Sequence, residues 1–208
     1  MQSLGGYQLQ GDTLQNHFFC DASERAYWSA LYISSTKDDK TLVCLTSSKN
    51  RLAPLKKVTL PRLELLAALV GTRLLHYFCT VTSYDINQAI LRSEATMDLG
   101  WIRSDPNRWK NFATVTEIQT LTNPTEWKHC PELDNPANHL LHGLLGDQIQ
   151  SLNIWRHGAS WLARPAEVWP FGTLPTSHPV PEQTRKPIQV LTAIKPVSLI
   201  DASRFCSH

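Results

Sequence analysis

Prolines divide this chain more clearly than any other feature of its sequence. Seven of the thirteen prolines fall between Pro165 and Pro196, in a stretch that also contains Thr, Ser, Gly and Gln. Proline has no backbone donor and fixes φ, so a stretch of this composition predicts an extended linker and not a packed core. The packed fold is therefore expected before about residue 163.

Composition limits the class of protein. Of the 208 residues, 42% are hydrophobic and 18% charged, with a net charge of +2, as in a globular domain. The five cysteines are scattered and never spaced as C-x-x-C, which argues against a disulfide scaffold and a structural zinc site. The N-terminus lacks the pattern of a signal peptide, and the longest apolar stretch, residues 63–75, is too short to span a bilayer. We expect an intracellular protein, cytoplasmic or nuclear, that is not secreted and has no membrane partner.

The apolar pattern predicts three strands followed by alternating helices and strands. Residues 17–20, 26–34 and 42–46 have the composition of strands and are separated by turn-forming residues. Thr59 and Pro61 suit the cap and the first position of a helix, after which leucines recur at helical spacing. Further elements are expected as a strand at 88–93, helices at 96–102 and 108–121, a strand at 125–129, and a helix opened by Asn135 and Pro136.

This order of elements predicts an α/β fold. Three antiparallel strands followed by α/β units form a mixed five-stranded sheet flanked by helices. The order is that of ribonuclease H, although the pattern alone also admits other α/β folds.

Several long motifs resemble the ribonuclease H region of Bel/Pao-type LTR retrotransposon polyproteins. They are FCDASERAY (19–27), SSKNRLAPLKKVTLPRLEL (47–65), LGWIRSDPNRWKNF (99–112), EIQTLTNPTEWKHCPELDNPA (117–137) and WRHGASWL (155–162). The tail VSLIDASRF (197–205) resembles the segment that leads toward integrase in those polyproteins. The resemblance therefore covers most of the chain from about residue 17, and it implies the reverse transcriptase and integrase regions of the same polyprotein as ancestral partners.

What the resemblance implies is hydrolysis of RNA in an RNA–DNA hybrid with two Mg²⁺ ions. Hard oxygen ligands must hold two such ions about 3.5–4 Å apart. In the family, four acidic residues do this, and the matching positions here are Asp21, Glu64, Glu94 and Asn138. Asp21, Glu64 and Glu94 are the implied metal ligands.

Two of the four positions depart from the family pattern. The family has Asp-Ser where this chain has Glu94-Ala95, and Asn-Pro-Ala-Asp where this chain ends on Asn138. The extra methylene of Glu94 moves its carboxylate, and a misplacement of about 1 Å can cost on the order of 10²-fold in rate. Asn138 removes a negative charge and one ligand oxygen. We therefore expect impaired catalysis and weakened Mg²⁺ binding. The alternatives are a non-enzymatic remnant, a co-opted nucleic-acid or protein interaction module, and a fragment without a role.

Two basic clusters are candidates for contact with the phosphates of a hybrid or other nucleic acid. They consist of Lys49, Arg51, Lys56 and Lys57, in a run that ends at Arg62, and of Arg103, Arg108 and Lys110. Each could equally be a solvated surface. Trp101 and Trp109 are expected in the core and His129 in a structural role. Outside the family pattern, Asp21 alone would be a turn residue and Glu64 alone a favourable charge near a helix start.

The expected organisation has four parts. Residues 1–16 form an N-terminal extension, 17–147 the ribonuclease H-like domain, 148–163 an appended helical, Trp-rich segment, and 164–208 a Pro-rich linker toward a missing integrase region. The strand at 88–93 is expected in parallel beside the strand at 17–20, because the helix between them serves as a crossover. Asp21, Glu64, Glu94 and Asn138 are then expected around one cleft, flanked by basic residues.

Overall fold

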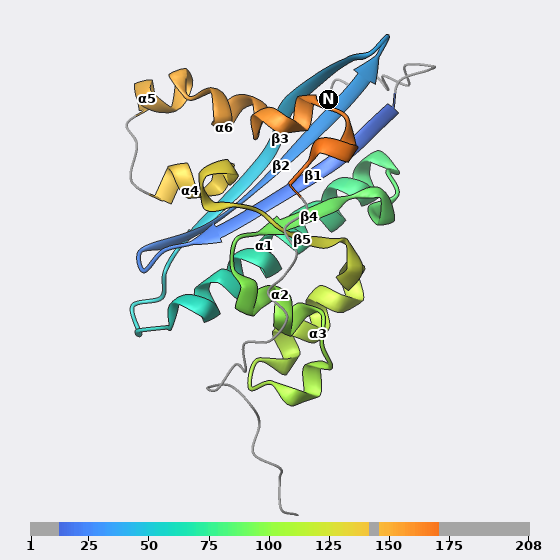
Figure 1. Cartoon of the computed structure of the whole chain (residues 1–208). Helices are drawn as coiled ribbons and strands as arrows, with labels where there is room; N and C mark the ends of the chain where they lie inside the picture. Colours follow the sequence, from blue (N-terminus) through green and yellow to red (C-terminus); the bar gives the residue numbers. More distant parts are fainter. Residues whose placement is uncertain (1–12, 142–145, 171–208) are drawn as a thin grey trace, which may run out of the picture.

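The computed structural model describes residues 13–141 and 146–170 and contains one mixed five-stranded sheet with strand order β3-β2-β1-β4-β5 (Figure 1). The strands are β1 (Thr13–Ala22), β2 (Ala26–Lys37), β3 (Lys40–Leu52), β4 (Ile90–Ser93) and β5 (Trp127–His129). The first three strands are antiparallel, and β4 and β5 are parallel to β1. The expected mixed sheet is confirmed, including the parallel pairing of β4 with β1.

The antiparallel meander is longer than the sequence pattern predicts. The hairpin between β2 and β3 turns at Asp38 and Asp39, which both have positive φ, as expected for a tight hairpin with polar turn residues. β1 begins at Thr13, four residues before the predicted domain boundary, and β3 continues to Leu52. Lys49 and Arg51 therefore lie on a strand and not in a loop, because β3 keeps pairing with β2 beyond its apolar residues.

The helices and 3₁₀ turns follow the predicted order. The helices are α1 (Leu60–Thr82), α2 (Thr96–Ile102), α3 (Phe112–Leu121), α4 (Pro136–Leu141), α5 (Gly146–Ser151) and α6 (Asn153–His157). The 3₁₀ turns are η1 (Ile86–Gln88), η2 (Pro106–Arg108), η3 (Pro124–Glu126), η4 (Glu132–Asp134), η5 (Ser160–Ala163) and η6 (Ala166–Val168). The predicted helix at 108–121 is shorter at its start, where η2 occupies residues 106–108.

The helix α1 fills the space against one face of the sheet. It is longer than the 63–75 stretch predicts, and by length and composition alone it could span a membrane. In the structure it packs on β1 and β2, where the Ser29 hydroxyl donates to the Ala67 carbonyl and Gly71 lies against the ring of Phe18. α2 and α3 lie on the same side (Figure 1). The position of α1 is that of a core helix of a globular domain.

The opposite face of the sheet is covered by the chain after α4. We call residues 153–170 the C-terminal clasp. Its tryptophans Trp155, Trp161 and Trp169 are buried against β1 and β2, and the Tyr32 hydroxyl donates to the Trp155 carbonyl at 2.8 Å. Trp169 lies in the stretch that composition assigns to the linker, so the expected end of contacts near residue 163 is too early. Composition misplaces it because a single tryptophan supplies enough apolar area to fix a short segment.

Candidate active site

Two carboxylates meet at the carboxyl ends of parallel strands. The last pair of the β1–β4 ladder is Cys20 with Ser93, and Asp21 and Glu94 are the next residues of the two chains. Asp21 is only 3% exposed. Its Oδ1 accepts a hydrogen bond from the Ala22 amide at 2.8 Å, whereas its Oδ2 and the Oε2 of Glu94 are buried without a partner among the described residues. The register of β1 and β4 thus places two unpartnered carboxylate oxygens, Asp21 Oδ2 and Glu94 Oε2, at one edge of the sheet.

A third carboxylate comes from the second turn of α1. The helix starts at Leu60, so Glu64 projects from its beginning, and it lines a cleft of about 400 Å³ together with Glu94. The other residues that line this cleft are Leu60, Pro61, Ala95, Thr96, Met97, His129 and Glu132. The expected approach of Glu64 to the carboxylate edge is therefore seen.

Burial and neighbouring acidic groups raise the pKa values of these three carboxylates. Burial, and then the charge of Glu94, raises the pKa of Asp21 to about 8. Burial and Glu94 also raise the pKa of Glu64 to about 7. The pKa of Glu94 itself is raised by burial and by Glu132, while the side chains of Asn135 and Asp21 act in the opposite direction. Such crowding of acids is unfavourable without a cation or proton between them.

The fourth position lies on α4, which Asn135 attaches to β1. The Asn135 side chain donates to the Cys20 carbonyl at 3.1 Å and accepts from the Ala137 amide at 3.2 Å, which makes it the predicted cap. Asn138 follows on the first turn of the helix and is half-buried. Within the described ranges its side chain has no hydrogen bond and does not line the cleft of Glu64 and Glu94. Glu64 and Glu94 thus line one cleft. Asp21 follows β1 beside Glu94 without being among the lining residues, and Asn138 lies on the adjacent helix.

Three residues near the cleft were not selected from the sequence. Glu132 adds negative charge beside Asp21 and Glu94, and His129 lines the cleft although a structural role was predicted for it. Asp98 on α2 is completely buried, and neither of its oxygens has a partner among the described residues. Burial, followed by the charge of Glu64, raises the pKa of Asp98 well above its usual range. The sequence could have indicated that Asp98 is buried, because it lies next to the apolar residues Leu99, Trp101 and Ile102 on a short helix.

The basic candidates lie outside the residues that line the cleft. Lys49 and Arg51 are exposed near the end of β3, and Lys56 and Lys57 are exposed on the loop that leads to α1. Arg103 donates to the Trp127 carbonyl and is thereby partly used in packing β5. The remaining candidates, Arg108 and Lys110, are also exposed, and Arg108 lies 5.5 Å from the centre of the Trp109 ring. Trp101 and Trp109 are buried, which confirms their expected place in the core.

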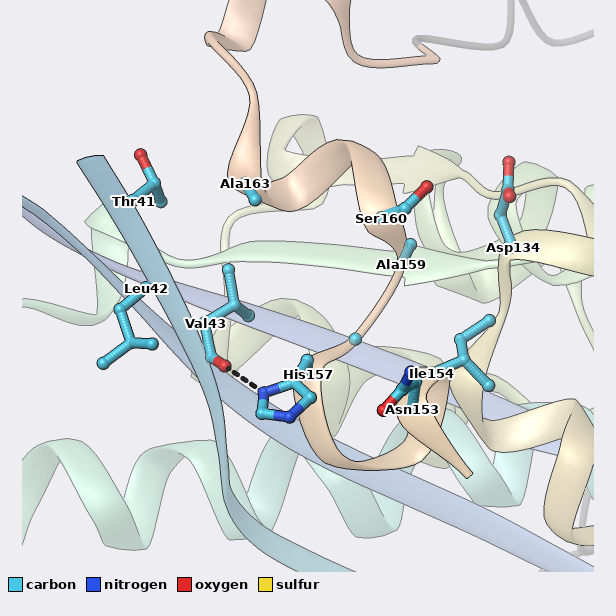
Figure 2. A pocket seen from close by; sticks show the side chains of 11 residues that line it. Thr41, Leu42, Val43, Asp134, Asn153, Ile154, His157, Ala159, Ser160 and Ala163 are labelled. Carbon is cyan, nitrogen blue, oxygen red and sulfur yellow. Dashed lines mark hydrogen bonds between the residues drawn. The ribbon is translucent and has the colours of Figure 1, made fainter. Parts of the chain in front are cut away.

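A second cavity, of about 520 Å³, lies on the clasp side of the sheet (Figure 2). Figure 2 shows the His157 ring beside β3, where its Nδ1–H donates to the Val43 carbonyl at 3.1 Å. Asn153, Ile154 and Ser160 line the same cavity. Neither Glu64 nor Glu94 lines this cavity. Its lining residues come mainly from β3, α6 and η5, and the hydrogen bond of His157 attaches α6 to the edge strand β3.

The donor set allows a limited test for a metal ion. Asp21 Oδ2 and Glu94 Oε2 are buried, unpartnered oxygens of the hard type that Mg²⁺ prefers, and Mg²⁺ commonly binds through one or two protein carboxylates. In the part of the chain that the structure describes, no three His, Cys, Asp or Glu side chains form a group that could hold a metal ion. The residues present therefore fit one cation at the Asp21–Glu94 pair, and the set for two ions is incomplete.

Comparison with known proteins finds one family model and several solved structures that are similar to this chain. Residues 7–95 match the family model described as the Pao retrotransposon-like RNaseH-like domain. Similar solved structures include the N-terminal RNase H domain of Rv2228c from Mycobacterium tuberculosis, a fusion with maltose-binding protein, at 13% identity. That alignment covers 67% of this chain and 99% of that one, with a TM-score of 0.42.

RNase H1 from the halophilic archaeon Halobacterium salinarum NRC-1 is similar at 12% identity over 62% of this chain and 92% of that one, with a TM-score of 0.36. No curated protein matches the sequence. The mixed sheet is that of an RNase H-like fold. Over residues 7–95, the chain is thus similar to the Pao retrotransposon-like RNaseH-like domain family.

Proposed function

We propose that this domain binds RNA–DNA hybrids or related nucleic acids and hydrolyses the RNA strand only weakly. The observation that carries this proposal is the pair of unpartnered oxygens of Asp21 and Glu94 at the sheet edge, combined with an amide at position 138. The pair supports binding of one divalent cation. The uncharged Asn138 and the longer Glu94 support a loss of efficient two-metal catalysis.

The residues at the cleft and on the loop before α1 have separate roles in the proposed function. Asp21 and Glu94 would hold Mg²⁺, which when bound activates water and neutralises charge on the scissile phosphate. Glu64 at the start of α1 adds negative charge on the other side of the cleft. The exposed Lys56 and Lys57 on the loop before α1 would contact the phosphate backbone, because that loop leads directly to the cleft residues Leu60 and Pro61.

A second candidate function is binding without cleavage. The observation that favours it is that the fold and the cleft are intact while the fourth acidic position is an amide. Such a module would retain affinity for a hybrid after all hydrolysis is lost. Cleavage and binding assays on the same protein separate the two functions.

The cleavage test compares the natural chain with Glu94→Asp/Asn138→Asp. We expect very slow Mg²⁺-dependent cleavage of an RNA–DNA hybrid by the natural chain and at least about 100-fold faster cleavage by the double variant, because both ligand positions regain a short carboxylate. Adding Asp21→Asn to the double variant is the control and should abolish the gain. Efficient cleavage by the natural chain would refute the proposed impairment, and a double variant that folds but remains inactive would favour binding without cleavage.

The binding test uses Lys56→Ala/Lys57→Ala and measures hybrid affinity by fluorescence anisotropy at several salt concentrations. Loss of two phosphate contacts should lower affinity and reduce the slope of log affinity against log salt by about 1–2. Lys37→Ala/Lys40→Ala, in the hairpin at the far end of β2 and β3, is the matched control with the same change of charge. If both double variants lower the affinity for the hybrid equally, the lysines act only through the overall charge of the protein, and Lys56 and Lys57 form no specific binding surface.

A further inference from the structure

A buried arginine lies on the clasp side of β4. Arg92 is only 1% exposed, and its guanidinium carbon lies 4.8 Å from the ring centre of Trp161, 5.3 Å from that of Trp169 and 5.5 Å from that of Phe19. Within residues 13–141 and 146–170, no carboxylate lies within salt-bridge distance of it. Aromatic faces therefore take the place of an anion as the surroundings of this cation.

The same side chain also joins β4 to β1. Arginine can only donate, so Arg92 Nη1 donates to His17 Nδ1 at 3.2 Å. His17 must then be neutral with its proton on Nε2, which donates to the Ser34 hydroxyl at 2.9 Å on β2. Burial and the charge of Arg92 lower the pKa of His17, in agreement with a neutral ring. Arg92 and His17 together thus connect three strands of the sheet.

The strand that carries Arg92 is short, and it pairs with β1 on one side and with β5 on the other. β4 has four residues, whereas β1 and β2 have ten and twelve. Its register with β1 decides whether Glu94 follows Ser93 to a position beside Asp21. Glu94 lies two residues after Arg92, so a shift of β4 by one residue would move Glu94 by about 3.3 Å along the strand.

We propose that Arg92 is a positioning residue that holds β4 in register between β1 and the C-terminal clasp, and so keeps Glu94 beside Asp21. This inference rests on the proposed function, because a cation at Asp21 and Glu94 is the ligand whose binding depends on that register. It extends the site to Trp161 and Trp169, which lie on the opposite face of the sheet from α1.

The test measures Mn²⁺ affinity by electron paramagnetic resonance on the full chain. Arg92→Met removes the charge and the hydrogen bond to His17 while keeping much of the apolar stem. We expect at least about a 10-fold loss of affinity, since displacement of a ligand by about 1 Å has large effects. Arg92→Lys retains a cation among the rings and should stay within about 3-fold of the natural chain. Val115→Ala in α3 is the control for a general loss of core packing, and Asp21→Asn is the control for the site itself.

Hydrogen exchange of the same variants supplies a second measurement. Arg92→Met should accelerate exchange of the amides of residues 91–93 by at least about 100-fold beyond any change in β2, whereas Val115→Ala should not discriminate between the two strands. If Arg92→Met does not fold, Trp169→Leu removes one wall of the aromatic surroundings and should change both measurements in the same direction to a smaller extent.

The outcomes distinguish the two proposals. Affinity for Mn²⁺ within about 3-fold of the natural chain in Arg92→Met, with β4 exchange no faster than that of β2, would overturn the role of Arg92. If the natural chain binds no Mn²⁺, or Asp21→Asn binds it equally, the proposed metal function fails. Exchange then decides the inference: selective loss of protection in β4 supports it, and uniform or absent loss overturns it.

Discussion

A buried carboxyl group without a hydrogen-bond partner costs free energy, and both oxygens of Asp98 are in this situation among the described residues. The side chain lies on α2, where its charge raises the pKa of Cys20 and the charge of Glu64 raises the pKa of Asp98. Because burial raises its pKa well above the usual range, the folded protein holds Asp98 in its protonated form where the unfolded chain would ionise it.

Replacing Asp98 by valine should therefore stabilise the domain. The expected gain is about 1–3 kcal/mol in the free energy of unfolding at pH 8, measured by urea denaturation. The folded pKa is raised, so the natural chain loses stability as pH rises above about 4, and the gain from Asp98→Val should shrink when the measurement is repeated at pH 5. Glu24→Val, at an exposed position between β1 and β2, is the control and should change stability little. A loss of stability in Asp98→Val at pH 8 would contradict the prediction.

At the scale of single elements, a glycine sets how closely α1 approaches the sheet. A Cβ added at Gly71 would lie 1.6 Å from Cζ of Phe18, a distance that no packing can accept without movement of the ring. Gly100 on α2 offers the opposite case, because a Cβ there would meet no atom within 4 Å. The two glycines are both helical, and only their surroundings differ.

Alanine substitutions at these two positions should have opposite signs. Gly71→Ala should lower the free energy of unfolding by about 1–3 kcal/mol through overpacking, despite the better helix propensity of alanine. Gly100→Ala should raise it by about 0.5–1 kcal/mol, since alanine loses less backbone freedom on folding. Chemical denaturation of both variants checks this pair, and a stabilised Gly71→Ala would show that α1 can move away from β1 at little cost.

The helices and strands also show which parts of the fold could be predicted from the sequence. The apolar alternation and the caps predicted every strand, the helix with Pro61 at its start, and the place of Asn135, because these follow from local patterns. The parallel register that brings Asp21 beside Glu94 followed from the crossover through α1. The continuation of β3 to Leu52 was missed because its last residues are polar and exposed and are held only by ladder hydrogen bonds.

The interactions that connect distant parts of the chain were beyond local patterns. The aromatic surroundings of Arg92 come from β1 and the clasp, separated from it by more than sixty residues on each side, and no period in the sequence connects them. Glu132 and His129 join the cleft through the position of β5 and η4, and neither residue stands in a local pattern that points to a site.

At the scale of the whole molecule, the sheet has two apolar faces and each needs its own cover. α1, α2 and α3 supply one cover, and α4 with the C-terminal clasp supplies the other (Figure 1). Trp161 and Leu162 reach the second face because Gly158 turns the chain with φ of 69°, and a Cβ there would lie 2.7 Å from Leu162 Cδ1. The folded unit therefore extends to the end of the clasp.

Truncation should expose this dependence. A chain that ends after residue 147 lacks all three clasp tryptophans and should lose at least about 3 kcal/mol of unfolding free energy, comparable to deletion of one large core side chain. A chain that ends after residue 170 keeps every contact described here and serves as the control. Thermal or urea unfolding of the two chains checks the prediction, and equal stability would place the end of the folded domain at residue 147.

The position of the clasp in the chain also has a consequence for synthesis. β1, β2 and α1 leave the ribosome first, whereas Trp169 is made 87 residues after Thr82. At about 5–20 residues per second, this delay lasts roughly 4–17 seconds. Until it ends, the cover of Phe19 and Tyr32 on the second face is incomplete, although the helix on the first face is complete. A nascent chain in this state presents apolar strands to the cell, so chaperone binding during translation is expected to concentrate in the interval that ends with the clasp.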